Sequence, residues 1–184
     1  MSKGIRDFVY SSAVAGHTEK LGVIYSSVAD AQKDTFIQHQ KIVFLPNTDR
    51  TEIQRAASNK IACMISISSL QNAFDLVKQS GVTYVHVNMN GPPLIDFAWM
   101  SLAKENKIGV VFSLADIQLA FYGKNVNALQ EFRKAARLLE KAHVSLYIAS
   151  LAKESFEVLS KTESHALLKY LGTKNPEKMN EGEM

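Results

Sequence analysis

The chain has 184 residues, of which 46% are apolar, and a formal net charge of +3. This length fits one domain with a sizeable core, and no apolar run reaches the roughly 18 residues that a membrane span needs. The mildly basic balance permits contact with nucleic acid without demanding it. The single cysteine, Cys63, excludes an internal disulfide. Together with an N-terminus that lacks a signal-peptide pattern, it favours a cytoplasmic protein.

Short apolar runs rich in β-branched residues recur along the chain, as is typical of strands buried on both faces. They predict seven strands, at residues 7–10, 22–25, 41–45, 61–67, 82–87, 108–114 and 145–150. Cys63 lies inside the fourth run and is expected to be a small buried hydrophobe.

The segments between these runs show helical periodicity and helix-end signals. Helices are predicted at 29–40, 49–58, 69–80, 94–106, 127–143, 152–160 and 163–171, with a turn or short helix at 15–21 and a short turn before 127. Asp49 and Ser69 are expected to cap the second and third helices, and Gly81 to end the third. Residues 173–184 are polar and aperiodic, so a single domain is predicted over 1–172, followed by a disordered tail.

Strands that alternate with helices through short connections indicate an α/β protein with parallel strands. An open doubly wound sheet and a closed barrel both fit this alternation. Seven βα repeats favour the barrel, although the usual eightfold barrel has about 250 residues. The predicted fold is therefore a compact, TIM-like βα barrel.

Motifs that would identify an enzyme are missing from the sequence. There is no glycine-rich phosphate loop, and the histidines form neither HxH nor HExxH. His86 is expected to be a half-buried strand histidine with a hydrogen-bond partner. Asp96 and Asp116 are expected to stabilise helix starts, where a carboxylate interacts well with the helix dipole. A Ser/His/Asp triad stays open as an alternative, but the GxSxG nucleophile motif is absent.

Cations gather in the C-terminal half of the chain. Arg133, Arg137 and Lys141 recur every four residues on the predicted helix 127–143, with Lys134 beside them. Such a stripe is either an ordinary solvated face, partly balanced by Glu131 and Glu140, or a row of cations facing phosphates. Beyond the last strand, Ser150 and Lys153 fall at the end of a barrel where ligands bind. Further lysines extend the basic surface: Lys104, Lys107, Lys124, Lys161 and Lys169.

Three stretches of this half resemble a known family. They read IDFAWMSLAKENKIGVVFSLADIQLA, EFRKAARLLEKAHVSLYIASLAKE and ESHALLKYLG, and they fall within residues 84–172. The pattern is similar to ribonuclease P protein component 3, the archaeal counterpart of the eukaryotic thirty-kilodalton subunit. The resemblance implies a barrel related to the polymerase-and-histidinol-phosphatase fold. It also implies an accessory role in the ribonucleoprotein that removes 5′ leaders from precursor tRNA.

The resemblance further implies that catalysis belongs to the RNA, with its own Mg²⁺, and that this chain carries no catalytic residue, metal or cofactor. Its expected partners are the ribonuclease P RNA, protein component 2 and other subunits, and, indirectly, precursor tRNA; no membrane is expected. Lys153 matches the lysine of the family's Ala-Lys step, and Ser150 matches the strand-end serine. Arg133 and Arg137 lie on the matching basic helix, which makes Arg133, Lys134, Arg137, Lys141, Ser150 and Lys153 the predicted RNA-binding residues.

Two positions depart from the related proteins. Tyr10 and Ser12 stand where the related phosphatase barrels would carry an HxH pair. Residues 159–163 read LSKTE, where family members carry Arg-x-Pro-x-Asp, so an RNA contact from that loop is in doubt.

Two other functions compete with RNA binding. A metal-dependent phosphoester hydrolase would need metal ligands or an acid/base pair at the strand ends. A protein-interaction scaffold would use Phe121 and Tyr122, beside Gly123, to bind a partner; the alternative for these two residues is core packing at a helix end.

Overall fold

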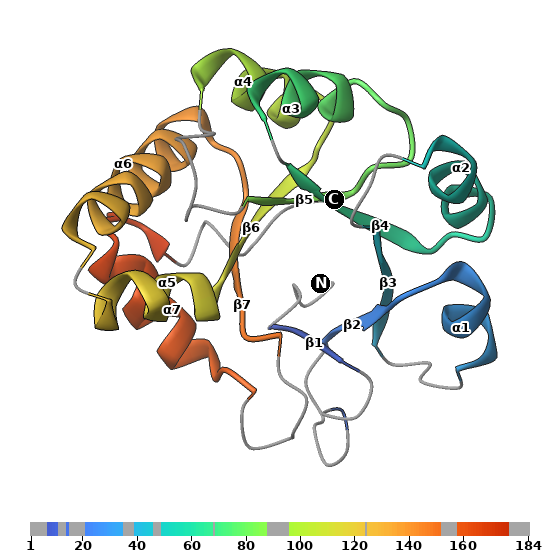
Figure 1. The fold of residues 1–184 in the computed structure, drawn as a ribbon, viewed down its shortest axis with the longest axis horizontal. Coiled ribbons are helices and arrows are strands. Elements are labelled where there is room, and N and C mark those ends of the chain that lie inside the picture. Colours follow the sequence, from blue (N-terminus) through green and yellow to red (C-terminus); the bar gives the residue numbers. More distant parts are fainter. Residues whose placement is uncertain are drawn as a thin grey trace.

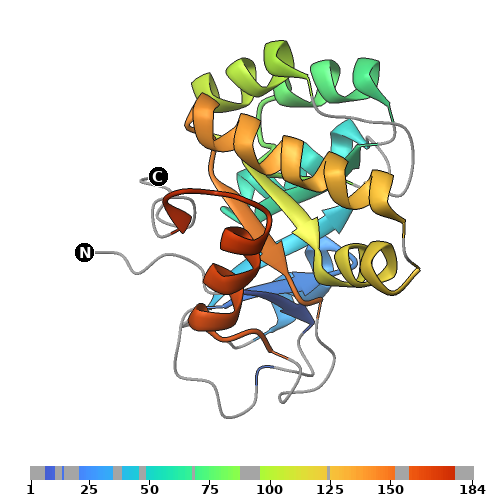
Figure 2. The ribbon, with the colours of Figure 1, turned by 90° about the vertical axis from the view of Figure 1, so that its left-hand side faces the viewer.

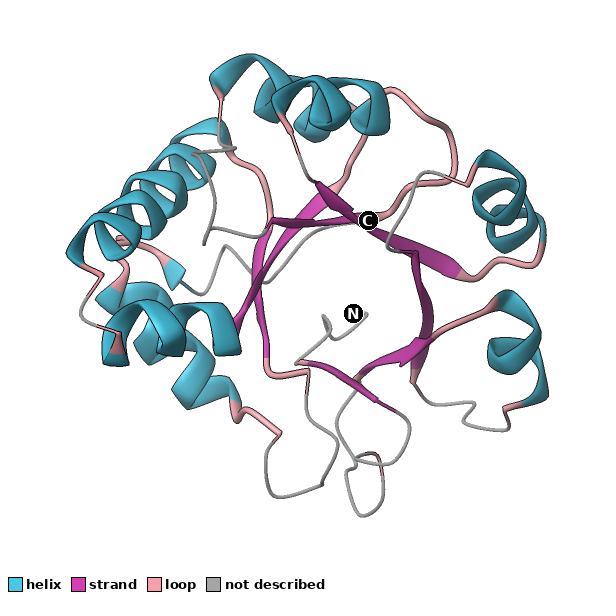
Figure 3. Ribbon diagram, in the orientation of Figure 1, coloured by secondary structure: helices cyan, strands magenta, loops and turns pink. Residues whose placement is uncertain are grey.

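The structure is a computed structural model, and it describes residues 7–10, 14, 21–34, 39–45, 49–67, 69–87, 96–123, 125–151 and 158–176. Seven parallel strands follow one another around a single sheet in sequence order. They are β1 (Phe8–Tyr10), β2 (Gly22–Tyr25), β3 (Gln40–Leu45), β4 (Ala62–Ile67), β5 (Tyr84–Val87), β6 (Gly109–Ser113) and β7 (Leu146–Ala149). Figures 1 and 3 show these strands as a ring with the helices outside it. The predicted TIM-like βα barrel with parallel strands is confirmed.

Seven helices of the described residues surround the ring. They are α1 (Val28–Lys33), α2 (Arg50–Ser58), α3 (Leu70–Val77), α4 (Phe97–Glu105), α5 (Leu114–Tyr122), α6 (Val126–Ala142) and α7 (Lys161–Tyr170). The predicted caps are confirmed, because Asp49 accepts from the N–H groups of Thr51 and Glu52, and Ser69 accepts from that of Asn72. None of the helices in the described part of the chain is both long and apolar enough to cross a membrane.

The barrel is nearly closed, because its first and last strands meet. The Leu151 N–H, just after β7, donates to the Phe8 carbonyl oxygen in β1 at 3.0 Å. Leu151 has φ 52°, a left-handed conformation that is uncommon for a side chain of this kind. The turn that it makes places the end of β7 beside the start of β1.

Strand side chains alternate between the barrel interior and the helix layer, as the period of two requires. Three rings fill the interior edge to face, with centroids 5.0 Å apart for Phe8 and Tyr84, 5.4 Å for Phe8 and Tyr147, and 5.7 Å for the two tyrosines. Gly109 makes this packing possible, since a Cβ there would lie 2.8 Å from the Tyr147 ring and 3.0 Å from the Tyr84 ring. The interior is therefore a packed core rather than a pore.

The larger part of the core lies between the strands and the helices. Outward strand residues such as Cys63 pack there, fully buried against the helices. Burial raises the pKa of the Cys63 thiol to about 12, as expected of an unreactive buried cysteine. The prediction for Cys63 is confirmed.

Two helix predictions were wrong. The helix predicted at 29–40 ends at Lys33, and residues 35–38, including the expected inward residues Phe36 and Ile37, lie outside the described residues. Asp34 is held away from the helix, because its side chain accepts from the Tyr25 hydroxyl at 2.6 Å and its carbonyl from Lys41 at 2.6 Å. The short turn predicted before residue 127 is instead the nine-residue helix α5.

The segments around the last helix also differ from expectation. Residues 158–160 are not helical, although a helix was predicted at 152–160; residues 152–157 lie outside the described part. After α7, Thr173 is 4% exposed, and the N–H groups of Lys174 and Asn175 donate to Glu140 of α6.

Candidate functional site

The predicted basic stripe lies on α6, the longest helix in the described part of the chain. Its apolar face packs on the barrel through small and large residues: Ala128, Phe132, Ala135, Ala136, Leu139 and Ala142. Lys134, Arg137 and Lys141 are exposed and Arg133 is half-buried. Figure 2 shows α6 with α5 and α7 on one side of the molecule.

The two arginines contact α7 and the turn that follows it. The Arg133 guanidinium lies over the Tyr170 ring, 4.8 Å from its centroid. Arg137 covers the backbone of Gly172, where an added Cβ would lie 2.8 Å from its Nε and 2.9 Å from its Nη2. The structure therefore brings Arg133 and Arg137 together on one surface, with their guanidinium groups resting on the C-terminal helix.

The carboxylates of these helices already have partners within the chain. Glu131 pairs with Lys134 at 2.6 Å. Glu140 accepts from the backbone N–H groups of Lys174 and Asn175, at 2.7 to 3.0 Å. Glu163 accepts from the Ser160 N–H in the capping box of α7.

The arginines, by contrast, are not neutralised locally. No carboxylate in the described part of the chain forms an ion pair with Arg133, Arg137, Lys141 or Lys169. The α6–α7 surface, defined here by Arg133, Arg137, Lys141 and Lys169, therefore carries positive charge that an external anion can neutralise.

Ser150 lies apart from this surface, at the end of β7. Its backbone N–H donates to the Asp7 carboxylate at 2.8 Å, and the N–H groups of Leu159 and Phe8 donate to the same carboxylate at 2.9 and 2.7 Å. Burial raises the pKa of Asp7, and these hydrogen bonds act in the opposite direction. Ser150 thus belongs to the contact between the first and last strands, here called the barrel seam. Lys153 lies outside the described residues.

Asp7 is a residue that the sequence reasoning missed. It is fully buried and joins β1, β7 and the approach to α7. A carboxylate at the start of an apolar run is the one local signal that could have found it, because a buried charge must be hydrogen-bonded. The segment 159–163 departs from the family pattern. Its residues make the Leu159 hydrogen bond to Asp7 and the capping box of Ser160.

Aromatic side chains stand beside Arg133. Phe121 is 52% exposed, Tyr122 is 76% exposed and Tyr170 is 43% exposed. Of the two possibilities given for Phe121 and Tyr122, core packing is therefore wrong. Their rings contact each other edge to face at 5.6 Å, and Phe121 contacts Tyr170 at 6.4 Å.

The mouth of the barrel, at the carboxyl ends of the strands, holds a second polar cluster. His86 on β5 faces the interior, where its Nδ1 lies 3.2 Å from the Ser66 hydroxyl of β4. Its Nε2 lies 3.9 Å from an Asp116 carboxylate oxygen in the first turn of α5. Ser66, His86 and Asp116 thus lie in the order of a Ser/His/Asp triad, but the buried His86 Nε2 makes no hydrogen bond to the carboxylate at this distance.

Burial lowers the pKa of His86, because it disfavours the protonated, charged form of the ring. The prediction that it has a hydrogen-bond partner is confirmed by Ser66. The prediction that Asp96 caps a helix is also confirmed, since it accepts from the Ala98 N–H of α4. Asp116 lies at a helix start as expected, but it also faces His86, which local sequence did not indicate.

The position proposed for an HxH pair is only partly described. Tyr10 ends β1 and is 37% exposed, and Ser12 lies outside the described residues. Within the described part, no three His, Cys, Asp or Glu side chains come together in a way that would hold a metal ion.

No protein-family model and no curated protein matches the sequence. Solved structures do match the fold. A chain in a cryo-EM structure of archaeal ribonuclease P with mature tRNA matches with a TM-score of 0.64 and 16% identity, covering 82% of this chain and 68% of that one.

Two further structures match less well. An uncharacterized protein matches with a TM-score of 0.55 and 14% identity over 78% of this chain, and an amidohydrolase with 0.53 and 14% over 76%. The chain spans 41% and 39% of the length of those two proteins. At these identities the likeness establishes a shared α/β barrel, and the chain is similar in fold both to a component of a ribonucleoprotein and to a hydrolase.

Proposed function

We propose that the chain is an RNA-binding protein subunit of a ribonuclease P-type ribonucleoprotein, which processes precursor tRNA. In this proposal it helps to hold the catalytic RNA in shape together with a second protein subunit, component 2. The RNA and its own Mg²⁺ carry out the cleavage, so this chain supplies contacts rather than chemistry.

The observation that carries the proposal is the charge imbalance on the α6–α7 surface. The two helices contain six cationic residues and three acidic ones. All three acidic side chains are engaged within the chain, by Lys134, by backbone N–H groups or by a helix cap. The arginines are left to bind an external polyanion, and planar guanidinium groups suit phosphate oxygens.

Two further facts support an RNA rather than a small anion as the ligand. The cations from Arg133 to Lys141 span about two turns of α6, roughly 12 Å, a length that matches successive backbone phosphates better than a single anion. The fold is also similar to a chain of an archaeal ribonuclease P complex, over 82% of the present chain. Ser150, which directly follows β7, and Lys153, which lies outside the described residues, remain proposed contacts.

The test is a titration of ribonuclease P RNA with the purified chain at rising salt. Replacing both arginines, as Arg133→Gln with Arg137→Gln, should lower the slope of log K against log salt by about 2. At 0.1 M salt the affinity should fall by about tenfold for each lost contact. Binding that does not depend on salt would overturn the proposal.

Matched variants separate charge from packing, because both arginines also contact α7. Arg133→Lys with Arg137→Lys keeps the charges and should retain most of the affinity. Arg55→Gln removes a cation that already pairs with Glu52 at 3.3 Å, and it should leave the affinity within about twofold. Circular dichroism of each variant checks that α7 stays folded.

The mouth cluster favours a second candidate function, hydrolysis of a phosphoester. Ser66, His86 and Asp116 are arranged as a nucleophile, a neutral base and a carboxylate that would stabilise the protonated base. A phosphoester such as p-nitrophenyl phosphate, assayed with and without added Zn²⁺ or Mn²⁺, tests it. Turnover that disappears in both Ser66→Ala and His86→Gln would support this function, and no turnover in the unchanged protein would exclude it for this substrate.

A further inference from the structure

We propose that Phe121, Tyr122, Tyr170 and Arg133, here called the aromatic face, bind unpaired RNA bases by stacking. This inference rests on the proposed function and deepens it by naming which part of an RNA the chain contacts. It assigns a ligand to three exposed rings that the barrel does not need for its own packing.

The four side chains form one continuous row. The Arg133 guanidinium covers Tyr170 at 4.8 Å, Tyr170 contacts Phe121 at 6.4 Å, and Phe121 contacts Tyr122 at 5.6 Å. Edge-to-face contacts of this kind hold the rings in place without burying them, since Tyr122 remains 76% exposed. The row crosses from the end of α5, over the end of α7, to the middle of α6.

Two further large apolar side chains on these helices are exposed. Leu119 on α5 is 62% exposed and Val126 on α6 is 61% exposed. Exposed apolar side chains that contact one another, as the three rings do, mark a binding site more often than singly scattered ones do.

The charge beside the row favours RNA as the occupant. Arg133 belongs to the row, Arg137 lies one turn further along α6, and Lys169 precedes Tyr170. None of the three forms an ion pair within the described part of the chain. Rings flanked by cations provide both the stacking platform and the phosphate contacts that single-stranded nucleic acid uses.

The ring arrangement also selects unpaired over paired RNA. In an A-form duplex the base faces are stacked on one another, and the base edges are recessed in the grooves. A side-chain ring can reach a base face only in a loop, a bulge or a single strand. The aromatic face therefore fits an unpaired segment, with the α6–α7 cations on its phosphates.

The test uses the full chain and two probes, a single-stranded RNA of about twelve nucleotides and the duplex of the same sequence. A 2-aminopurine in the single strand reports stacking through fluorescence quenching. The unchanged protein should prefer the single strand and quench the probe. Tyr122→Ala with Phe121→Ala should weaken single-strand binding at least about fivefold and abolish the quenching, with a smaller effect on the duplex.

Two variants serve as controls. Phe97→Ala removes a ring of similar exposure, 56%, from the start of α4, and should change nothing. Tyr122→Trp keeps a stacking ring and should retain both affinity and quenching. Because Phe121 and Tyr122 are surface residues, their replacement is not expected to unfold the barrel, and thermal unfolding checks this.

The outcomes separate the inference from the proposed function. If Tyr122→Ala with Phe121→Ala leaves single-strand binding unchanged while Arg133→Gln with Arg137→Gln weakens it, the stacking site is wrong and the RNA-binding function stands. The same holds if the aromatic variant keeps its RNA affinity but loses a protein that co-purifies with the chain. If the unchanged protein binds neither these probes nor ribonuclease P RNA, the proposed function itself is wrong.

Discussion

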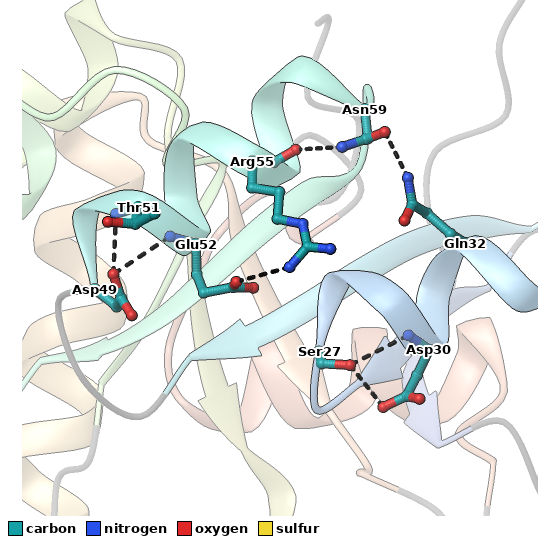
Figure 4. A network of polar contacts seen from close by, with 8 residues as sticks. All are labelled: Ser27, Asp30, Gln32, Asp49, Thr51, Glu52, Arg55 and Asn59. Carbon is teal, nitrogen blue, oxygen red and sulfur yellow. Dashed lines mark hydrogen bonds and ion pairs between the residues drawn. The ribbon is translucent and has the colours of Figure 1, made fainter.

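Polar side chains make different contacts on two sides of the barrel. Helices α1 and α2 lie on one side, and α6 and α7 lie on the other. On the first side several polar side chains hydrogen-bond or pair with one another, as Figure 4 shows. Ser27 caps α1 and hydrogen-bonds Asp30, Arg55 pairs with Glu52, and Gln32 donates to Asn59 at 2.6 Å, which links the two helices. On the second side Arg133 and Arg137 have no such carboxylate among the described residues.

Exposed apolar side chains follow the same division. Of the eight large ones in the described part of the chain, none lies on α1 or α2, and five lie on α5, α6 or α7: Leu119, Phe121, Tyr122, Val126 and Tyr170. Exposed rings beside unneutralised cations suit the α5–α7 side to bind a partner, and α1 and α2 carry no such rings among the described residues. The α5–α7 side is therefore the surface on which we propose that RNA binds.

The largest effect is expected at Asp7, where the start of the chain meets the α7 side. Asp7→Ala would leave three buried N–H groups, those of Phe8, Ser150 and Leu159, without an acceptor. The cost should be at least about 3 kcal/mol of unfolding free energy, measured by urea denaturation. Asp49→Ala, which removes an exposed cap on the α2 side, should cost only about 1 kcal/mol; equal losses would contradict the role of Asp7.

A smaller effect is expected at the contact between α6 and the end of α7. Gly172 has φ 92°, and Gly172→Ala would both strain the backbone and push against the Arg137 guanidinium. The expected cost is about 1–2 kcal/mol, measured by chemical denaturation. In an Arg137→Ala background the clash disappears and the cost should fall; if it does not, Arg137 does not pack on Gly172.

A pH effect is expected at the barrel mouth, where α5 meets the strands. The pKa of His86 is lowered by burial from its ordinary 6.5, so the unfolded chain binds a proton that the folded one does not. Stability should therefore be lost as pH falls below about 6.5, and His86→Gln should remove that part of the dependence. The raised pKa of Asp7, from 3.8, changes stability with pH in the opposite direction, but it does so equally in the unchanged protein and in His86→Gln. The difference in stability between these two proteins therefore reports His86 alone. Identical pH profiles of unfolding would show that His86 is protonated equally in both states.

The smallest effect is expected on the α1–α2 side. Arg55 and Glu52 pair at the surface, with side chains 53% and 28% exposed, so Arg55→Gln should cost no more than about 0.5 kcal/mol. A tenfold loss of RNA affinity in this variant would contradict the comparison, because it would mean that RNA also binds α2.

The strands and most helix starts were predictable, because their signals are local. Each buried strand is a continuous apolar run, and Asp49, Ser69 and Asp96 cap their helices through hydrogen bonds two or three residues away. The helix α5 was missed because it lacks such a local start signal. Its N-cap, Ser113, forms no side-chain cap hydrogen bond, so the usual start signal has no physical counterpart there.

The site was less predictable, because its contacts join distant parts of the chain. The cationic stripe on α6 was predictable from its four-residue spacing. The sequence does not show that Arg133 stacks on Tyr170, or that Glu140 accepts hydrogen bonds from the N–H groups of residues 174 and 175. Asp116 looked like a helix-start carboxylate, and only the fold places it beside His86. The premature end of α1 depends on Lys41, seven residues beyond Asp34.

The seam at Asp7 has a consequence for how the protein is made. Its carboxylate can bind Ser150 and Leu159 only after a further 143 and 152 residues have been made, so β1 can pair with β2 early but is joined to the end of β7 much later. Contacts of such long range form late and slowly. The nascent barrel therefore stays open between β1 and β7 until Leu159 has been synthesised, and an RNA or protein that binds earlier during translation meets an open ring.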